Sequence, residues 1–404
     1  MSRYPNDWQH VRLADSGHWL SGGTPNTAFP PYWNGSIPWI SAASLKSFHI
    51  TDSDRRITPL GARSGSRMVP PNTVLFVVRG MSLKSEFRVG VTEREVAFGQ
   101  DCKAIIPRPD IDSKFLAYSL RANASRVLSM VDEAGHGTGR LPTDQLGALT
   151  IGAPKRSEQR QIVKVLESLD DSIESTARLI NKKEKLRDGT LLQFFQSIES
   201  ASDSIVLANL RRGDSPILKI GPFGSSLKGR DWVQSGVPVI TIGSLGVGRF
   251  HVDELLHITP SKANLLSAYR VRVGDVVFSR VADVGRSVVI GRDQEGWIMS
   301  SNLLRISADP DIVRPTFLQL SLAHSPRVRG QLRATTNSSG RDVTSARIIA
   351  ALSIDVPPRP QQDLICSAWQ AATAAIAAER AQLAKLRSLK EGLVEDLTTG
   401  RVRL

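Results

Sequence analysis

Two loops rich in glycine and serine carry the side chains of this sequence that are best suited to hold an anion. The first is Gly135-His-Gly-Thr-Gly-Arg140 and the second is Asn337-Ser-Ser-Gly-Arg341. Glycines let backbone N–H groups approach a phosphate closely, and an arginine adds charge and paired hydrogen-bond donors. An ordinary surface turn is the alternative interpretation of each loop. Their candidate contact residues are His136, Thr138, Arg140, Asn337, Ser338, Ser339 and Arg341.

Further candidates follow apolar segments or glycine turns in both halves of the chain. Arg79 and Arg280 each come directly after an apolar run, where a rigid backbone would hold a long side chain in place. Contact with a phosphate, or plain solvent exposure, is expected more often at such positions than the reading of a base. The other candidates lie in neighbouring loops and are Ser21, Gly23, Thr24, Lys84, Arg88, Ser225, Ser226, Lys228 and Arg286.

Motifs that would support catalysis are absent from the sequence. It has no Gly-x-x-x-x-Gly-Lys-Ser/Thr phosphate loop, no His-Glu-x-x-His and no Asn/Asp-Pro-Pro-Tyr tetrapeptide of the kind that amino-methyltransferases carry. Gly246-Val-Gly248 lacks a third glycine, and no Gly-x-Ser-x-Gly accompanies His136 and Asp132. We therefore predict a binding protein without catalytic residues or metal ligands. An enzyme with an unrecognised site and a scaffold that binds only protein are the alternatives.

The candidate positions recur because the sequence consists of two similar halves. Ile37-Pro-Trp-Ile-Ser-Ala-Ala-Ser-Leu45 returns as Val237-Pro-Val-Ile-Thr-Ile-Gly-Ser-Leu245, and Leu149-Thr-Ile-Gly-Ala-Pro154 returns as Leu352-Ser-Ile-Asp-Val-Pro357. The offset between equivalent residues grows only from 200 to 203. Two similar but diverged modules are expected to bind two similar but non-identical targets.

Positive charge is concentrated in these two modules. The chain of 404 residues has a net charge of +13, of which residues 1–156 hold +6 and residues 205–356 hold +7. Residues 157–204 hold −2 and residues 357–404 hold +2. Two separately basic modules favour a polyanionic ligand with two contact sites, and a merely soluble basic protein is the alternative.

Signals for export, membrane insertion and disulfide formation are not found. No run of about 18 apolar residues occurs, and no apolar segment follows the first residues, so we predict neither a membrane span nor a signal peptide. Cys102 and Cys366 have no spaced partners, which excludes a disulfide framework and a cysteine-rich zinc site. We expect a cytoplasmic protein.

Two segments without proline predict long amphipathic helices, one from Ser157 to about Ile198 and one from Gln361 to Leu397. Each has a narrow apolar seam at a 3-4 spacing and begins after a proline-rich stop. We expect the helices to pair along these seams in antiparallel orientation, and two separate surface helices are the alternative. The expected seam residues are Ile162, Leu166, Leu169, Ile173, Ile180, Ile365, Trp369, Ile376, Leu383, Leu386, Leu389 and Leu393.

The predicted fold class is mixed α/β. Apolar runs such as Val74-Leu-Phe-Val-Val78 and Val276-Val-Phe278 predict strands, and Phe115–Leu128 and Pro315–Leu322 predict short helices. The expected architecture has two tandem modules and a coiled-coil pair of long antiparallel helices, with pseudo-two-fold symmetry. The expected boundaries are 1–156 for the first module, 157–204 for the central helix, 205–356 for the second module and 357–404 for the C-terminal helix.

These motifs, in this order, resemble the specificity subunit of type I restriction-modification systems over nearly the whole chain. Trp8, Ser21-Gly-Gly-Thr-Pro25 and Ile37-Pro-Trp-Ile40 look like the opening of that family's target recognition domain. Gly221-Pro-Phe-Gly-Ser-Ser-Leu-Lys228 looks like an alternative opening, and Leu397-Thr-Thr-Gly-Arg-Val402 is similar to the family's ending. One departure is Gln361, because the first repeat has Glu158 there and the second helix lacks that charge.

The resemblance implies a function in phage defence and DNA methylation. Each module would read one half of a bipartite, asymmetric site in double-stranded DNA, while the helices set the spacing and dock two methyltransferase subunits. S-adenosylmethionine is expected on those partners and no cofactor on this chain. Restriction subunits with nuclease and translocase activity are further possible partners, and no membrane is involved.

Overall fold

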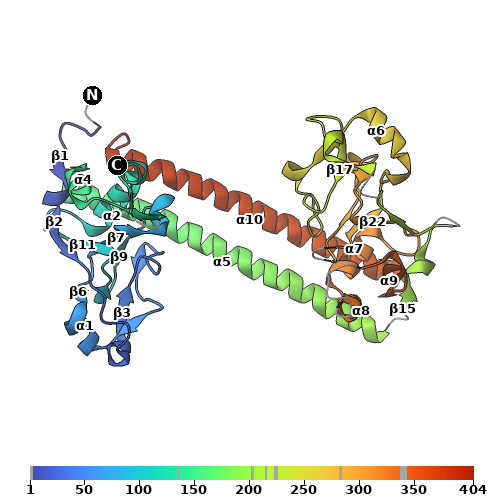
Figure 1. Ribbon diagram of the computed structural model, residues 1–404, viewed down its shortest axis with the longest axis horizontal. Helices are drawn as coiled ribbons and strands as arrows, with labels where there is room; N and C mark the ends of the chain where they lie inside the picture. The colour runs from blue at the N-terminus through green and yellow to red at the C-terminus, as the bar shows by residue number, and fades with distance from the viewer. Residues whose placement is uncertain are drawn as a thin grey trace. The chain divides into compact units, whose positions relative to one another are not determined.

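Apolar segments form the strands of two units, each built from one sequence module and parts of both long helices (Figure 1). The structure, a computed structural model, describes residues 3–134, 137–201, 204–213, 216–222, 226–281, 284–336 and 344–404. The N-terminal unit comprises Met1–Arg178 with Arg380–Leu404, and the C-terminal unit comprises Leu179–Glu379. Each long helix therefore contributes one part to each unit.

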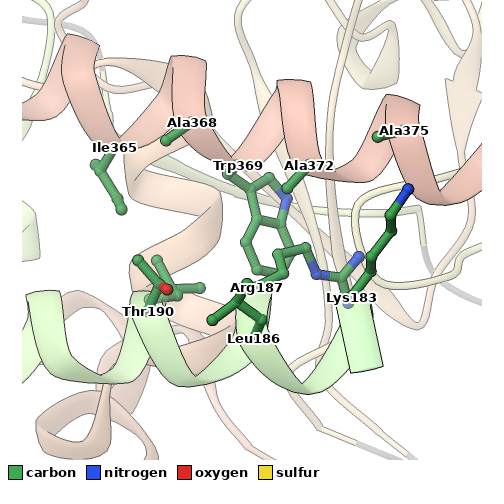
Figure 2. A pocket seen from close by; sticks show the side chains of 10 residues that line it. Lys183, Leu186, Arg187, Thr190, Ile365, Ala368, Trp369, Ala372 and Ala375 are labelled. Carbon is green, nitrogen blue, oxygen red and sulfur yellow. The ribbon is translucent and has the colours of Figure 1, made fainter. Parts of the chain in front are cut away.

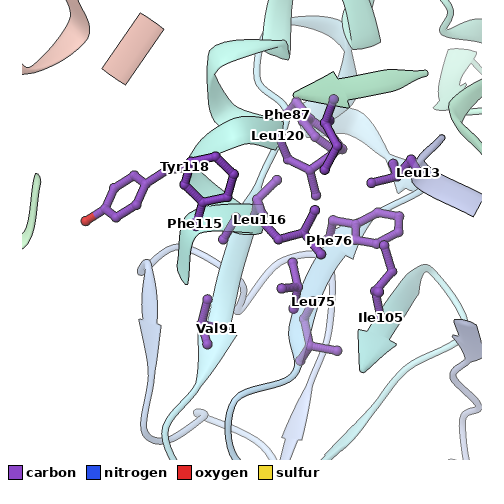
Figure 3. Close-up of a cluster of buried hydrophobic side chains, with 14 of the residues drawn as sticks. Leu13, Leu75, Phe76, Phe87, Val91, Ile105, Phe115, Leu116, Tyr118 and Leu120 are labelled. Carbon is purple, nitrogen blue, oxygen red and sulfur yellow. The ribbon is translucent and has the colours of Figure 1, made fainter. Parts of the chain in front are cut away.

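The N-terminal unit is organised around a five-stranded sheet with the order β2-β11-β7-β9-β4. Its helix α2 (Ser113–Ala122) packs on β7 and β9, and its Phe115, Leu116 and Tyr118 are buried in the same core as Phe76, with Leu116 nearest to that ring (Figure 3). Such large apolar side chains, fully removed from water, supply most of the stabilising free energy of a core. The strands are β2 (Gly17–Ser21), β4 (His49–Ile50), β7 (Val74–Val77), β9 (Val89–Thr92) and β11 (Cys102–Pro107).

Smaller sheets complete the N-terminal unit, together with the short helices α1 (Pro59–Gly65), α3 (Ala124–Leu128) and α4 (Thr143–Ala148). One has the order β5-β3-β10-β6, one has the order β12-β13-β8, and one pairs β1 with β14. Their strands are β1 (Gln9–Arg12), β3 (Trp33–Ile40), β5 (Arg56–Ile57), β6 (Arg67–Val69), β8 (Arg79–Gly80), β10 (Val96–Phe98), β12 (Asp132–Ala134), β13 (Thr138–Arg140) and β14 (Thr150–Ala153).

The C-terminal unit repeats this plan, with sheets ordered β16-β22-β19-β20, β18-β17-β21 and β15-β23. Val239 of β17 pairs in parallel with Ile298 of β21, as Trp39 of β3 pairs in parallel with Ala97 of β10 in the other unit. The sequence repeat is thus also a repeat of strand pairing. The elements are β15 (Ser204–Val206), β16 (Leu218–Ile220), β17 (Val237–Ile240), β18 (Leu256–Ile258), β19 (Val276–Ser279), β20 (Ser287–Val289), β21 (Ile298–Met299), β22 (Leu303–Ile306), β23 (Ser353–Asp355), α6 (Pro260–Leu265), α7 (Pro315–His324), α8 (Pro326–Thr336) and α9 (Ala346–Ala350).

The short-helix predictions are confirmed with one correction. The helix expected over Pro315–Leu322 is α7, which continues to His324. The helix expected over Phe115–Leu128 is instead two helices, α2 and α3, separated at Asn123. The Asn123 side chain donates a hydrogen bond to the Ser119 carbonyl oxygen, 2.8 Å away, so it ends α2 by competing for a backbone acceptor.

The two predicted long helices are α5 (Arg156–Ala201) and α10 (Arg359–Thr399). A buried glutamine anchors the start of each helix to the preceding loop. Gln159 donates to the Pro154 carbonyl oxygen at 2.8 Å and accepts from the Asp112 N–H at 2.7 Å. Gln362 makes the same contacts with the Pro357 carbonyl oxygen and the Arg314 N–H, both at 2.8 Å. These repeated contacts fix the direction in which each helix leaves its module.

Antiparallel pairing of α5 with α10 is confirmed within each unit. In the N-terminal unit, Asp170 forms an ion pair with Lys390, and Glu158 pairs with Arg403 at 2.7 Å. In the C-terminal unit, Lys183 pairs with Glu379 at 2.7 Å, and Arg187 lies over the Trp369 ring at 4.3 Å. Contact positions rise along α5 as they fall along α10, which contradicts the alternative of two unpaired surface helices. The pseudo-two-fold relation between the modules stays a prediction.

The prediction that Leu389 lies in the seam is wrong, because its side chain is 51% exposed. Lys390 occupies the inward position instead, and Val394 and Leu397, four and seven residues further on, are buried. The true stripe runs 386, 390, 394 and 397, which fits 3.6 residues per turn better than the leucines do. Of the other expected residues, those that are buried are Ile162, Leu166, Ile180, Ile365 and Ile376, and those that are partly buried are Leu169, Ile173, Trp369, Leu383, Leu386 and Leu393.

The ends of the long helices belong to the cores of the units. Leu166 of α5 and Leu397 of α10 join the apolar core of the N-terminal unit, and Phe195 packs against Phe317 of α7 in the C-terminal unit, with 6.0 Å between ring centroids. No helix in the described parts of the chain is both long and apolar enough to cross a membrane.

Candidate nucleic-acid interface

Strand direction gathers several candidate residues at one edge of the main sheet in the N-terminal unit. Strands β2 and β7 both run antiparallel to β11, so their carboxyl ends lie at the same edge. The loop Ser21–Thr24 leaves β2 there, and Arg79 follows β7 there. Arg88 directly precedes β9 at this edge, where its carbonyl oxygen accepts a hydrogen bond from the Val77 N–H at 3.1 Å. Residues that are distant in sequence are thus brought together.

Arg79 and Arg140 are direct cross-strand neighbours in the small sheet β12-β13-β8. Their Cβ atoms are therefore expected to be about 5 Å apart on one face. Both side chains are exposed, and neither forms a hydrogen bond or an ion pair with any residue that the structure describes. Like charges placed directly opposite each other destabilise a strand pair. A bound anion would remove this repulsion, so the pair is suited to hold a phosphate or an electronegative base edge.

Glycines allow the close packing that supports this arginine pair. Gly80 lies opposite Gly139, and its φ of +153° is rarely adopted by residues with a side chain. A Cβ atom on Gly139 would lie 2.9 Å from the Leu83 Cβ, inside contact distance. The next residue, Met81, is 64% exposed, an apolar side chain beside the two arginines that the sequence analysis did not select. The sequence signal that could have pointed to this site is Gly80, a glycine directly after the strand-end residue Arg79.

Other candidates at this edge have partners within the protein. Lys84 pairs with Glu133 at 3.2 Å, although both side chains are largely exposed and the pair contributes little stability. Ser21 accepts a hydrogen bond from the Lys103 ammonium group at 2.9 Å. A Cβ atom on Gly23 would lie 2.3 Å from the Gly65 carbonyl oxygen, so this glycine serves internal packing. Thr24 and Thr138 are partly buried.

Arg88 and Arg286 occupy equivalent places in the two units and hold a loop. The Arg88 guanidinium donates to the Ala42 carbonyl oxygen at 3.2 Å, and that of Arg286 donates to the Leu245 carbonyl oxygen at 3.3 Å. Each acceptor lies shortly after the parallel strand of its unit, β3 or β17. Both arginines therefore position a loop at the candidate edge, in addition to any contact with a ligand.

The C-terminal unit has an equivalent edge, at which two strands of its main sheet end. Strands β16 and β19 both run antiparallel to β22, so the segment after Ile220 and the residue Arg280 lie at one edge. The Arg280 carbonyl oxygen accepts a hydrogen bond from the Thr344 N–H at 2.8 Å, which fixes its backbone. Ser226 and Lys228 lie further along the first segment, and the Lys228 N–H donates to Asp231 at 2.7 Å. The candidates that fall outside the described residues are His136, Ser225, Asn337, Ser338, Ser339 and Arg341.

A polar network that the sequence analysis missed ties the N-terminal module to the helix pair. The Tyr118 hydroxyl of α2 donates to Asp170 of α5 at 2.7 Å, and Lys390 of α10 pairs with the same carboxylate. Burial, reinforced by the hydrogen bond to Asp170, raises the pKa of Tyr118, so the hydroxyl keeps its proton. This contact is made by side chains on three elements that no local pattern connects.

The helix pair of the C-terminal unit has an apolar groove of about 350 Å³ between α5 and α10 (Figure 2). Leu186 at its margin is 68% exposed, and the Trp369 ring lies against Arg187. Exposed apolar surface of this kind marks interaction sites. In the described parts of the chain, no cluster of three or more His, Cys, Asp or Glu could hold a metal ion.

Comparisons with known proteins find similar proteins among the specificity subunits of type I restriction enzymes. The sequence profile of the type I restriction modification DNA specificity domain matches residues 5–185. The EcoR124I/EcoR124II specificity subunit of Escherichia coli is 28% identical over 177 residues, which are 43% of this chain and 44% of that subunit. The MjaIX specificity subunit of Methanocaldococcus jannaschii is 26% identical over 49% of this chain and 45% of its own length. The chain thus spans just under half the length of these two relatives.

Longer matches cover both modules. The MjaVIII specificity subunit of Methanocaldococcus jannaschii is 20% identical over 100% of this chain and 94% of its own length. The solved S subunit from M. genitalium has the same fold, with a TM-score of 0.59 at 15% identity over 98% of both chains. The HsdS subunit from Thermoanaerobacter tengcongensis has a TM-score of 0.50 at 16% identity, over 99% of this chain and 98% of that one. This chain is therefore similar to the specificity subunits of type I restriction-modification systems, by sequence in its N-terminal half and by fold over its whole length.

Proposed function

We propose that this chain is the sequence-specific DNA recognition subunit of a type I restriction-modification complex, and that each unit reads one half of a bipartite site. The observation that carries the proposal is the cross-strand pair of Arg79 and Arg140 at the strand-end edge of the N-terminal unit, whose side chains have no partner among the described residues. Arg280 follows the equivalent strand of the C-terminal unit. Net charges of +6 and +7 in the two modules supply the long-range attraction to DNA.

The two units should read different sequences, which makes the site asymmetric. Arg79-Gly80-Met81 of the N-terminal unit corresponds to Arg280-Val281 at the same strand end of the C-terminal unit. Base reading depends on which side chains reach the groove, and a change in these side chains changes the preferred base. Divergence at equivalent positions therefore supports two different half-sites.

Methyl transfer and cleavage are assigned to partner subunits. The sequence lacks the motifs of a methyltransferase, so S-adenosylmethionine is expected on a methyltransferase subunit and not on this chain. Two such subunits would dock on the helix pair, for which the apolar groove beside Leu186 is a suitable surface. A restriction subunit would join the same complex.

Reconstitution of methylation tests this assignment. The purified chain alone should transfer no methyl groups, and addition of the methyltransferase subunit should yield methylation at one bipartite motif. Sequencing of modified bases in the host genome and in the reconstituted reaction gives the motif. Robust methyl transfer by the chain alone would favour the enzyme alternative. A salt-dependent DNA affinity would exclude the alternative of a scaffold that binds only protein.

We propose further that the helices set the gap between the half-sites. Both α5 and α10 contain residues of both units, so an insertion in both at Arg178/Leu179 and Glu379/Arg380 lengthens the connection. Four inserted residues add about 6 Å of helix. With about 3.4 Å for each base pair, the gap in the methylated motif should grow by one or two base pairs while both half-sites stay the same. A changed half-site, or an unchanged gap in an active variant, contradicts this role.

A further inference from the structure

A cavity of about 450 Å³ in the C-terminal unit is lined by basic side chains and by no acidic one. It lies between α8 and the loop that joins β19 to β20, and none of the residues that the structure places on its wall is Asp or Glu. Gly285 and Arg286 come from the loop, while Arg329 and Arg333 come from α8. His324 at the end of α7 also lines the cavity, but burial lowers the pKa of its imidazole, so the positive charge comes from the arginines.

Two of these guanidinium groups have no partner among the residues that the structure describes. Arg329 and Arg333 form no hydrogen bond or ion pair through their side chains with any described residue. The Arg329 Nη1 atom lies 3.0 Å from the point that a Cβ atom on Gly285 would occupy. Gly285 has a φ of +114°, which favours glycine, and this lets the guanidinium lie directly along the loop backbone. Several like charges around one cavity repel each other unless an anion enters it.

The N-terminal unit supplies an internal comparison. Arg126-Val-Leu128 of α3 corresponds to Arg327-Val-Arg329 of α8, because the central valine is fully buried in both units. Leu128 thus stands where the C-terminal unit has Arg329. The neighbouring cavity of the N-terminal unit, about 280 Å³, is lined by Lys84 together with Asp132 and Glu133. With one basic and two acidic side chains this cavity has no excess of positive charge to attract an anion, so the basic character belongs to the cavity of the C-terminal unit.

We propose that the basic cavity beside α8 holds a backbone phosphate of the DNA half-site read by the C-terminal unit. The inference rests on the proposed function and adds a contact residue set, Arg329 and Arg333, that the sequence motifs do not indicate. The cavity adjoins the β19–β20 loop, which follows the strand-end residue Arg280. Guanidinium groups bind phosphate oxygens through paired, charge-assisted hydrogen bonds. A phosphate held there fixes the register of the half-site without reading a base.

The first test measures DNA affinity of the full complex with its methyltransferase subunits as a function of salt. The probe is a duplex that carries the methylated genomic motif. Arg329→Leu, which introduces the residue of the N-terminal unit, should weaken binding about tenfold, as expected for loss of a charged hydrogen bond. The slope of log affinity against log salt should fall by about 0.9 for the lost phosphate contact. The methylated motif should stay unchanged, and Arg329→Lys should restore part of the slope.

A matched control separates this site from general charge. Arg292 is exposed and follows β20, whose carboxyl end lies at the edge of the sheet opposite to Arg280. Arg292→Leu removes the same charge from the same unit and should leave affinity and slope unchanged. Circular dichroism and the thermal unfolding midpoint verify that each variant is folded.

A second test places the phosphate. In a series of duplexes, one phosphate at a time is replaced by a neutral methylphosphonate. At one position beside the second half-site, this replacement should weaken binding of the wild-type complex but not of the Arg329→Leu complex. If no such position exists, or if the salt slope is unchanged in both Arg329→Leu and Arg333→Gln, this inference is wrong while the proposed function still stands. Failure of the wild-type complex to bind the motif overturns the proposed function as well. If inorganic phosphate raises the wild-type unfolding midpoint while no DNA position is coupled, the cavity binds a free anion and the DNA contact is refuted.

Discussion

Removal of residues 394–404 is expected to unfold the N-terminal unit, although these residues are the last in the chain. Val394 and Leu397 are 9% and 1% exposed and lie in one apolar core with Trp8, Ile162 and Leu166. Burial of each such side chain contributes about 1.5–3 kcal/mol. The deletion also leaves the apolar surfaces of its former neighbours exposed to water. The total loss, on the order of 5 kcal/mol, is comparable with the free energy of unfolding of a whole domain, about 5–15 kcal/mol.

Hydrogen exchange measured by mass spectrometry reports this loss by segment. Peptides from residues 4–153 should lose protection in the truncated chain, whereas peptides from residues 216–334 should keep it. Val402→Ala and Leu404→Ala serve as controls, because both side chains are exposed and their loss should change stability by less than about 0.5 kcal/mol. Protection lost first in the C-terminal unit would show that the end of α10 does not belong to the N-terminal core.

Replacement of both Arg79 and Arg140 by alanine should reduce affinity for the methylated motif by about a hundredfold or more. Each arginine that contacts a phosphate or a guanine contributes about 1–3 kcal/mol, and the two face the same ligand from adjacent strands. Their removal also relieves the repulsion between them, so the folded chain should be no less stable. Loss of affinity with unchanged or increased thermal stability is therefore the signature of a ligand-binding pair.

Binding of labelled duplexes by the reconstituted complex measures the effect. The double variant should tolerate base changes in one half-site while it still discriminates at the other, and the gap should not change. Arg178→Ala is the control, because that side chain is 70% exposed on α5 and pairs only with Glu174 within the described residues. Wild-type affinity and discrimination in the double variant would exclude these arginines from the interface, and with them the main support for the proposed DNA-binding site of this unit.

The sequence alone was sufficient for features that depend on local pattern and on the repeat. The 3-4 spacing of Ile162, Leu166 and Ile180 indicates a helix because helical periodicity is set by neighbours within two turns. The short apolar runs before Arg79 and Arg280 indicate strands, because this pattern too depends only on neighbouring residues. Comparison of the two halves of the sequence identified equivalent positions. The order of these motifs resembles that of type I specificity subunits, whose fold the structure shares.

Tertiary structure decided which distant residues meet. The choice of Lys390 over Leu389 as the inward position follows from the rotation of α10 against Asp170, a register that leucine spacing alone does not specify. Arg79 faces Arg140 only because β8 pairs with β13 in one particular register, and a shift by one residue would turn the side chains to opposite faces. The basic cavity of Arg329 and Arg333 likewise depends on a loop more than forty residues away in the sequence. Such contacts arise from packing between elements, so a one-dimensional pattern of residues does not contain them.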